Sequence, residues 1–279
     1  MSDRRDAIGF SAPPLVRACV EAVARLGRPV FAVGGSIRDA ALGLPIEDWD
    51  FASAARPDAV AAQLREFGPT DALPELGRVR VVAGGEELVM TTVREEGDYG
   101  DDRRPGWLRF VDEPERDALR RDFSVNAIYV DAIGGDVIDP TGGRDDLLAR
   151  RLRLIGDPEQ RLSEDPLRAL RALRFEASRA LTPTAATVAA LASTAAKVAR
   201  LRPERRLDEL RRTFRAPAAA VAVRRLVDSG LLGHAIAALR GDDERVRLRA
   251  LPVLVALRAE AMPATERELL HWAALLGDP

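Results

Sequence analysis

The spacing of apolar residues changes at about residue 144, and this change constrains the fold more than any other feature of the sequence. Before it, short runs rich in β-branched and aromatic residues alternate with turn residues, as in strands of a sheet. After it, Ala, Leu and Arg recur at helical spacing. We therefore predict an α+β chain, with a mixed sheet first and helices after it. The expected strands lie in PVFAVGG, DWDFAS, RVRVVAG, ELVMTTV, WLRFV and AIYVDAIGGDVID, the last with a hairpin turn at Gly134–Asp136.

Composition indicates a globular protein with a sizeable core, since 47% of the 279 residues are hydrophobic. The single cysteine, Cys19, has no partner for an internal disulfide, and the polar first residues do not resemble a signal peptide. No apolar run approaches the roughly 18 residues that cross a bilayer. We expect a soluble, cytoplasmic protein without membrane contact, and the sequence does not specify an oligomeric state.

The net charge of −2 does not by itself indicate a nucleic-acid partner, but the charge is unevenly distributed. Acidic residues crowd the segment 86–102, whereas the segment 200–215 is basic. Lys197 is the only lysine, so an abundance of arginine could also reflect genome composition. If the basic segment touches RNA phosphates, RNA affinity will fall with salt. Its arginines are Arg200, Arg202, Arg205, Arg206, Arg211, Arg212 and Arg215.

The first segment that indicates chemistry is GGSIRDAALGLPIEDWDF, residues 34–51. Gly34 and Gly35 are predicted to end a strand and open a helix, so that bare backbone and helix amides can approach a triphosphate. Arg38 would add positive charge there. The alternative is an ordinary tight turn, which is the more frequent use of two glycines after a strand.

Asp48 and Asp50 follow in the same segment. Side chains two apart on an extended strand point the same way, so the two carboxylates converge while Trp49 points to the other face. Such oxygen ligands suit Mg²⁺, and two Mg²⁺ ions can activate a 3′-hydroxyl and stabilise a leaving pyrophosphate. A charged, solvated strand edge is the alternative for D-x-D alone, but the order strand, Gly-Gly, Arg and D-x-D favours a metal site.

The segment RRDFSVNAIYVD, residues 120–131, joins a charged cluster to an alternating strand. Arg121 could meet a phosphate or a base edge, and Asn126 could brace the loop by hydrogen bonds. The alternative is a surface Arg–Asp pair of little energetic value.

The segment EDPLRALRALRF, residues 164–175, places a carboxylate and three arginines three residues apart along a predicted helix. A carboxylate beside a guanidinium can match the hydrogen-bonding edge of a base without a nucleic-acid template. Leu167, Leu170 and Leu173 would face the core. The alternative is a helix face of ion pairs with no chemical role. The polar residues are Asp165, Arg168, Arg171 and Arg174.

These segments, together with DPTGGRDDL and RLRPERRLDEL, resemble the motif series of class II tRNA nucleotidyltransferases over residues 30–215. The matching motifs are GG-x-x-RD with D-x-D, RRDF-x-x-NA, ED-x-x-R-x-x-R-x-x-R and ER-x-x-x-EL. Bacterial poly(A) polymerases belong to the same class. The resemblance implies a polymerase β-like nucleotidyltransferase head domain over residues 1–143, an all-α neck over 144–215 and an abbreviated helical body over 216–279.

The resemblance also implies roles for individual residues. Asp48 and Asp50 match the family's Mg²⁺ ligands. The implied reaction adds CCA, from CTP and ATP, to the 3′ end of tRNA and releases pyrophosphate. The implied nucleotide-binding residues are Gly35, Arg38 and Arg121 for phosphate and sugar, Asp165 and Arg168 for the base, and Arg171 and Arg174 for support of the nucleotide.

Three narrower alternatives stay open: addition of A alone, poly(A) synthesis, and an RNA- or nucleotide-binding module without turnover. The segment 91–110 resembles the family's flexible loop for the switch to ATP, which argues against an enzyme that adds only the two C residues. ELGRVRVV lacks the basic-aromatic signature of bacterial poly(A) polymerases, which disfavours that alternative.

Several other residues are assigned no chemistry. The last residues, LLHWAALLGDP, resemble the start of an HD phosphohydrolase domain, but Gly277 stands at the metal-binding histidine, so we expect no hydrolase activity. His234 and His271 are expected to be core or surface residues rather than ligands. The sequence does not indicate a third carboxylate ligand for the metal, and Glu87 is only a guess for that position.

Overall fold

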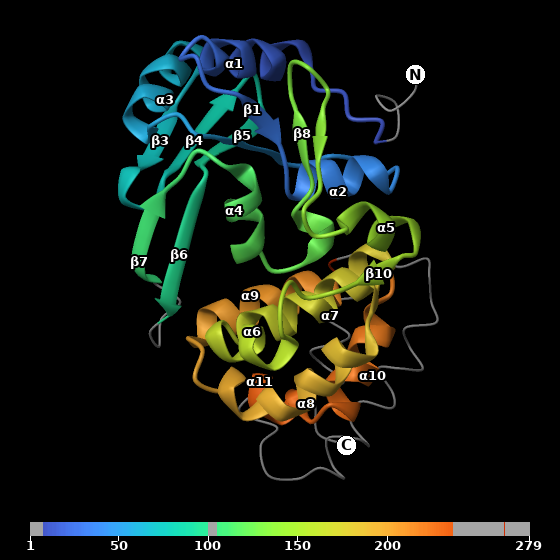
Figure 1. Ribbon diagram of the computed structural model, residues 1–279. Coiled ribbons are helices and arrows are strands. Elements are labelled where there is room, and N and C mark those ends of the chain that lie inside the picture. The colour runs from blue at the N-terminus through green and yellow to red at the C-terminus, as the bar shows by residue number, and fades with distance from the viewer. Residues whose placement is uncertain (1–7, 100–104, 237–264, 266–279) are drawn as a thin grey trace. The chain divides into compact units, whose positions relative to one another are not determined.

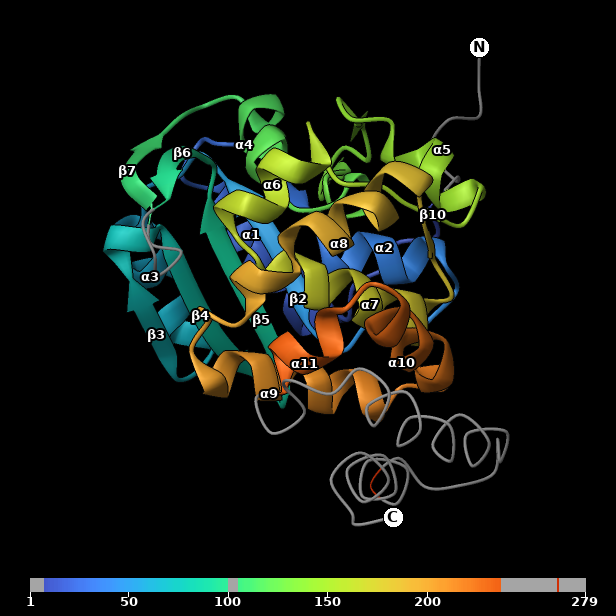
Figure 2. The same cartoon turned by 90° about the horizontal axis from the view of Figure 1, so that it is seen from below.

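The computed structural model describes residues 8–99, 105–236 and Thr265. These residues belong to two compact units, one comprising the chain through Asp98 together with Pro105–Ala149, the other including the chain from Arg150 onward. Figures 1 and 2 show the elements of each unit from two directions. Within the described residues, no helix has the length and apolar character needed to cross a membrane.

The first unit is built on a seven-stranded sheet with the order β3-β4-β5-β2-β1-β8-β9. β2 runs parallel to β5, whereas the other neighbouring strands are antiparallel, so the sheet is mixed as predicted. β2 is the central strand. Its hydrogen bonds to β5 on one side and to β1 on the other hold the residues at both of its ends in position. The strands are β1 (Val30–Ala32), β2 (Trp49–Ser53), β3 (Thr70–Leu73), β4 (Arg78–Ala83), β5 (Glu86–Thr92), β8 (Tyr129–Asp131) and β9 (Val137–Ile138).

One face of this sheet forms the core. Burial alternates along β4, where Val79, Val81 and Ala83 are buried and the residues between them are not. α1 packs beside α3, and α3 packs on β3, β4 and β5, as Figure 1 shows. The helices of the unit are α1 (Pro14–Ala24), α2 (Gly35–Ala41), α3 (Pro57–Leu64), α4 (Pro114–Arg120) and α5 (Gly143–Leu148), with short 3₁₀ turns η1 (Arg65–Phe67), η2 (Pro74–Leu76) and η3 (Ser124–Asn126).

The predicted flexible loop over residues 91–110 contains two strands, β6 (Arg94–Tyr99) and β7 (Pro105–Phe110), which form a sheet of their own. Its central residues, 100–104, lie outside the described residues. The base of this sheet is anchored to α4, because the amide of Arg94 donates to Asp117 Oδ1 at 3.0 Å.

The second unit is helical, as the spacing predicts. α7 buries Leu167, Leu170 and Leu173 in the core, which confirms the predicted apolar face. The N-termini of α6 and α8 are capped by Asp157 and Thr184, whose side chains accept backbone N–H groups three residues on. The helices are α6 (Pro158–Glu164), α7 (Leu167–Arg179), α8 (Ala185–Val198), α9 (Pro203–Phe214), α10 (Ala219–Asp228) and α11 (Leu231–Ala235).

The prediction that strands stop near residue 144 is wrong in one detail. β10 (Arg151–Leu152) and β11 (Thr182–Pro183) pair in parallel within the second unit. Each strand has only two residues, too few for a period-two pattern to appear in the sequence.

Candidate active site

The turn between β1 and α2 brings glycine backbone next to a carboxylate. Gly34 is the N-cap of α2 and has a φ of +71° and a ψ of −133°, a conformation that glycine alone adopts readily. A Cβ on Gly34 would lie 3.2 Å from Asp50 Oδ2 and 3.5 Å from Arg121 Nη1. Ser36 closes the turn, because its Oγ donates to the carbonyl oxygens of Val33 and Asp50. The prediction that Gly34 and the next glycine end a strand and open a helix is confirmed.

Asp48 immediately precedes β2, and Asp50 is the second residue of that strand. Trp49 between them is buried, and its Nε1 donates to Glu86 at 2.9 Å on the far side of the strand. Asp48 is exposed and Asp50 half-buried, which is the alternation expected of extended backbone. Asp50 is held in place, because its Oδ2 accepts the amide N–H of Gly35 at 3.2 Å.

Asp50 lies near a second carboxylate, that of Asp48, and near Arg121 and Arg38. Burial raises the pKa of Asp50, Arg121 and the Gly35 amide lower it, and the neighbouring carboxylate of Asp48 raises it again. A cation bound by both carboxylates would relieve their mutual repulsion, and carboxylate oxygens are ligands that Mg²⁺ accepts. The residues present therefore fit a divalent metal.

A third metal ligand is not assembled in the described part of the chain, where no group of three or more His, Cys, Asp or Glu side chains is placed to hold a metal. Glu87, the residue named as a guess, lies on β5 next to β2 but pairs with Arg80 at 2.7 Å. His234 lies in α11, and its carbonyl oxygen accepts from Arg206 Nη1. His271, Gly277 and the terminal HD-like segment lie outside the described residues.

Arg38 lies beside the glycine turn in α2 and is buried. Its Nε and Nη2 donate to the carboxylate of Asp39 at 2.8 Å each, and its Nη1 donates to Asn126 Oδ1 at 2.8 Å. A Cβ on Gly35 would lie 3.6 Å from Arg38 Nη2. Asn126 braces its own loop as expected, because its Nδ2 donates to Asp122 Oδ1 at 2.9 Å. It also fixes the direction of the Arg38 guanidinium, which was not predicted.

Arg121 is fixed on the other side of the turn. Its Nη2 donates to Asp117 Oδ2 at 3.0 Å, and its Nε donates to the hydroxyl of Tyr129 at 2.8 Å. The guanidinium also lies over the Tyr129 ring, 5.1 Å from its centroid. Asp117 is fully buried, so this network differs from the exposed Arg–Asp pair that was the alternative interpretation.

Asp117 joins Arg121 to the base of the β6–β7 sheet. Its Oδ1 accepts from Arg120 Nε at 2.8 Å and from the amide of Arg94 at 3.0 Å. Burial alone would raise the pKa of Asp117, but Arg120, Arg121 and the Tyr129 hydroxyl together hold that pKa well below its usual range. Asp117 was not predicted as a site residue from the sequence. The available signal was its position four residues before Arg121 on a helix.

The candidate base-reading residues lie at the start of α7. Asp165 is fully buried between α6 and α7, and its Oδ1 accepts the amide of Leu167 at 3.2 Å. Arg168 is also buried, and its Nη1 donates to the carbonyl of Arg161 at 3.0 Å. The carboxylate acceptor of Asp165 and the guanidinium donor of Arg168 are therefore both held in position at the N-terminus of α7.

The next two arginines of α7 point to a single acid on α9. Arg174 Nε donates to Glu209 Oε2 at 2.7 Å, and Arg171 Nη1 lies 3.9 Å from Glu209 Oε1. Both guanidinium groups also lie over the ring of Phe175. Glu209 is buried and holds the two arginines in place, a role that the sequence analysis did not assign to it.

The structure thus collects the predicted residues into two sets, each within one unit. Gly35, Arg38, Asp50 and Arg121 surround the β1–α2 turn, and the α7 residues form the second set. A mixed sheet with a glycine turn against a carboxylate of its central strand, and a second carboxylate directly before that strand, defines the nucleotidyltransferase class.

Comparison with known families agrees with this class. Residues 30–153 match the poly A polymerase head domain, and residues 181–239 match the probable RNA and SrmB binding site of polymerase A. The chain therefore belongs to the family of CCA-adding enzymes and poly(A) polymerases.

Individual relatives of the chain are CCA-adding enzymes. The chain is 37% identical over 242 residues to a CCA-adding enzyme of Geobacillus stearothermophilus, an alignment that covers 85% of this chain and 58% of the relative. It is 39% identical over 191 residues to a CCA-adding enzyme of Streptococcus pyogenes, covering 68% of this chain and 47% of the relative. The chain thus spans about half the length of the curated relatives it matches.

Solved structures show the same fold. The CCA-adding enzyme of Bacillus stearothermophilus in complex with CTP superposes with a TM-score of 0.70 at 29% identity, over 96% of this chain and 80% of that one. The CCA-adding enzyme of Thermotoga maritima complexed with tRNA gives a TM-score of 0.78 at 19% identity, over 99% of this chain and 66% of that one. The predicted polymerase-type head fold is confirmed.

Proposed function

We propose that this protein is a Mg²⁺-dependent, template-independent RNA nucleotidyltransferase that adds CCA to the 3′ end of tRNA from CTP and ATP. The observation that carries the proposal is the pair Asp48 and Asp50 next to the Gly34–Gly35 turn, with Asp50 fixed by the Gly35 amide at 3.2 Å. The relatives are named as CCA-adding enzymes, and solved relatives are described with CTP and with tRNA.

Asp48 and Asp50 would hold the metal, which when bound supplies positive charge to the reacting phosphate and lowers the pKa of the attacking hydroxyl. The chain's own residues position the nucleotide. The glycine backbone leaves room for the triphosphate, and Arg38 and Arg121 present guanidinium groups whose directions are fixed by buried partners. The RNA 3′-hydroxyl attacks the α-phosphate, and pyrophosphate leaves.

Asp165 and Arg168 would read the incoming base, because together they offer a hydrogen-bond acceptor and a donor at one helix start. Arg171 and Arg174 would support the nucleotide. Arg168→Ala tests this role: selectivity for CTP over UTP should collapse, while binding of Mg²⁺ to the first unit should stay the same. Unchanged selectivity would remove Arg168 from base reading.

We further propose that residues 1–143 form the catalytic head, 144–215 a neck that binds base and RNA, and 216–279 an abbreviated body. Five arginines of the basic segment are exposed, whereas Arg206 is buried and donates to the carbonyls of Ala199 and His234. Arg206 is therefore structural. The exposed ones suited to RNA phosphates are Arg200, Arg202, Arg211, Arg212 and Arg215.

Asp48→Ala separates catalysis from binding. We expect loss of nucleotide incorporation with RNA binding retained, measured by primer extension and filter binding on the same preparations. Asp71→Ala is the matched control, because this exposed carboxylate lies on β3, three strands or about 14 Å from β2. If Asp48→Ala incorporates nucleotides as the control does, Asp48 is not a metal ligand and the proposed site fails. If the wild type and the control bind RNA but incorporate no nucleotide, the protein is a binding module and the proposed activity fails.

A further inference from the structure

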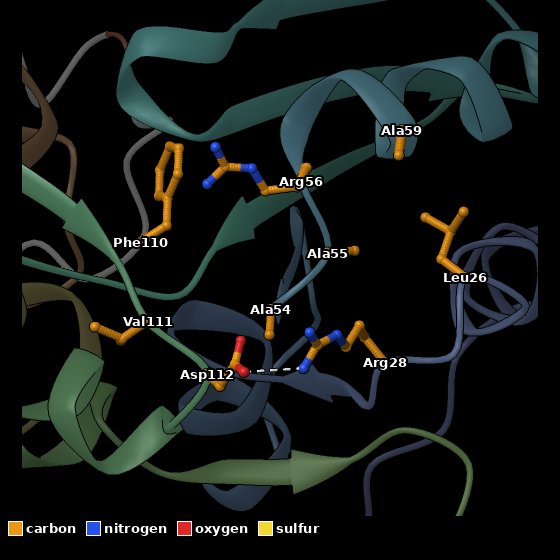
Figure 3. A pocket seen from close by; sticks show the side chains of 9 residues that line it. All are labelled: Leu26, Arg28, Ala54, Ala55, Arg56, Ala59, Phe110, Val111 and Asp112. Atoms are coloured by element: carbon orange, nitrogen blue, oxygen red, sulfur yellow. Dashed lines mark hydrogen bonds and ion pairs between the residues drawn. The ribbon is translucent and has the colours of Figure 1, made fainter.

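A cavity of about 290 Å³ lies in the first unit at the end of β2 that is opposite the glycine turn. Its walls come from the turn before β1, the β2–α3 connection, the first turn of α3 and the end of β7 (Figure 3). Ala54 on its wall follows Asp50 by four residues, or about 13 Å of extended strand. The cavity is therefore separate from the carboxylate pair. Ala59, in the first turn of α3, is part of the lining.

The lining combines an apolar surface with two arginines. Leu26, Ala55 and Val111 provide aliphatic surface, while Arg28 and Arg56 extend from different segments of the lining (Figure 3). Asp112 is the one acid in the lining, so the formal charge of the cavity is positive. Apolar walls with a few convergent polar groups are typical of small-molecule sites.

Arg56 is the stronger anion-binding group. It is exposed, and its guanidinium carbon lies 5.1 Å from the centroid of the Phe110 ring (Figure 3). Among the described residues no carboxylate pairs with Arg56. A guanidinium held against an aromatic ring keeps its donors in one plane, where they can meet two oxygens of an anion.

Arg28 is engaged only weakly. It donates to Asp112 at 3.0 Å, but the two side chains are 49% and 64% exposed. An ion pair so open to water contributes little, so an entering anion can take over the guanidinium of Arg28. Asp112 would then compete with the ligand.

We propose that this cavity binds a small aromatic phosphate ester of nucleoside monophosphate size. The phosphate would lie between Arg28 and Arg56, because these are the cationic groups of the lining. The planar ring would pack on the aliphatic wall and on the Arg56–Phe110 stack. The volume of about 290 Å³ lies just below the range of roughly 300–1,000 Å³ typical of ligand pockets, which restricts the occupant to a small molecule.

AMP is the probe, measured by calorimetry on the full chain in a metal-free buffer. Arg56→Gln should weaken AMP binding about tenfold, since it removes a charge-assisted hydrogen bond. Ala59→Leu should abolish binding by filling the cavity. Asp112→Asn should tighten binding, because the competing carboxylate is gone.

Arg168→Ala distinguishes this site from the proposed nucleotide site of α7 and should leave AMP affinity unchanged. Circular dichroism and thermal unfolding identify any variant that fails to fold. Inorganic phosphate should bind at least about tenfold more weakly than AMP, because it lacks the ring. The proposal is overturned if AMP does not bind, if Arg56→Gln and Ala59→Leu bind AMP as the wild type does, or if inorganic phosphate binds equally well.

Discussion

The amide of Gly35 donates a 3.2 Å hydrogen bond to Oδ2 of Asp50, and this contact joins the turn after β1 to the central strand β2. A turn that lets backbone approach a triphosphate is thereby held in register with the carboxylate that would bind the metal. The contact requires close approach, since a Cβ on Gly34 would also meet Asp50 Oδ2 at 3.2 Å.

Gly34→Ala should therefore lower both stability and activity. The positive φ of +71° should cost roughly 1–3 kcal/mol in the free energy of unfolding, and the added methyl should displace Asp50. Gly43→Ala is the matched control, because Gly43 has a φ of +70° and open space around its Cβ position. Urea unfolding and nucleotide incorporation measure the two effects. Equal loss of activity in both variants would show that the contact with Asp50 is irrelevant.

Asp117→Asn should destabilise the protein by about 3–5 kcal/mol, because it removes the fully buried charge that the partly buried Arg120 and Arg121 share. Nucleotide incorporation should also fall, since Arg121 loses its orientation. Asn keeps a single acceptor oxygen, so one of the two donor groups, either the Arg94 amide with Arg120 or the Tyr129 hydroxyl with Arg121, loses its acceptor. Urea unfolding at neutral pH measures the stability change, and a loss below about 1 kcal/mol would contradict the network.

The same carboxyl predicts a pH dependence. Because the folded-state pKa of Asp117 is lowered, its stabilisation is present above the unfolded value of about 4 and is lost as the pH falls through and below that value. The free energy of unfolding of the wild type should therefore decline below about pH 5, and more steeply than that of Asp117→Asn. Parallel declines would assign acid unfolding to other carboxyls.

Glu209→Gln tests the support of the α7 arginines. It removes a buried charge that Arg174 and Arg171 share, so apparent nucleotide affinity should fall, together with a loss of about 2–4 kcal/mol in stability. Asp208→Asn on the same helix is the control, because its pair with Arg212 is about 60% exposed on both sides and should contribute less than about 1 kcal/mol. Similar results for the two variants would contradict the assigned role of Glu209.

Cys19 should be inert in the folded protein. It is fully buried in α1, and burial raises the pKa of its thiol to about 11. At pH 8 a disulfide reagent should react only when the protein unfolds, so the rate should rise steeply with urea. Because the folded pKa is raised, stability should decline as the pH rises from about 9 through about 11. A rapid reaction of the native protein would contradict this burial.

Much of the site was accessible from the sequence because its determinants are local. The positive φ of Gly34, the alternation across Trp49 and the leucine stripe of α7 each follow from neighbours in the chain. The resemblance to a known motif series supplied the proposed roles. The two-residue strands β10 and β11 leave no such local pattern.

The partners that fix the arginines could not be predicted, because they are distant in sequence or their pairing depends on burial. Arg174 and Glu209 are separated by 35 residues, and Arg38 and Asn126 by 88. Asp117 is only four residues from Arg121, but its importance comes from its full burial and from contacts with Tyr129 of β8 and Arg94 of β6. A sequence pattern does not show which acid is enclosed.

The most direct test of the account is extension of three tRNA transcripts, ending before the CCA, after the first C and after CC, with CTP and ATP supplied separately and together. If the protein adds CCA with Asp48 as a metal ligand, all three transcripts end in CCA when both nucleotides and Mg²⁺ are present, and the Asp48→Ala variant extends none of them. Addition of a single A to the CC-ended transcript alone would identify an A-adding enzyme, and absence of extension in all three would contradict the account.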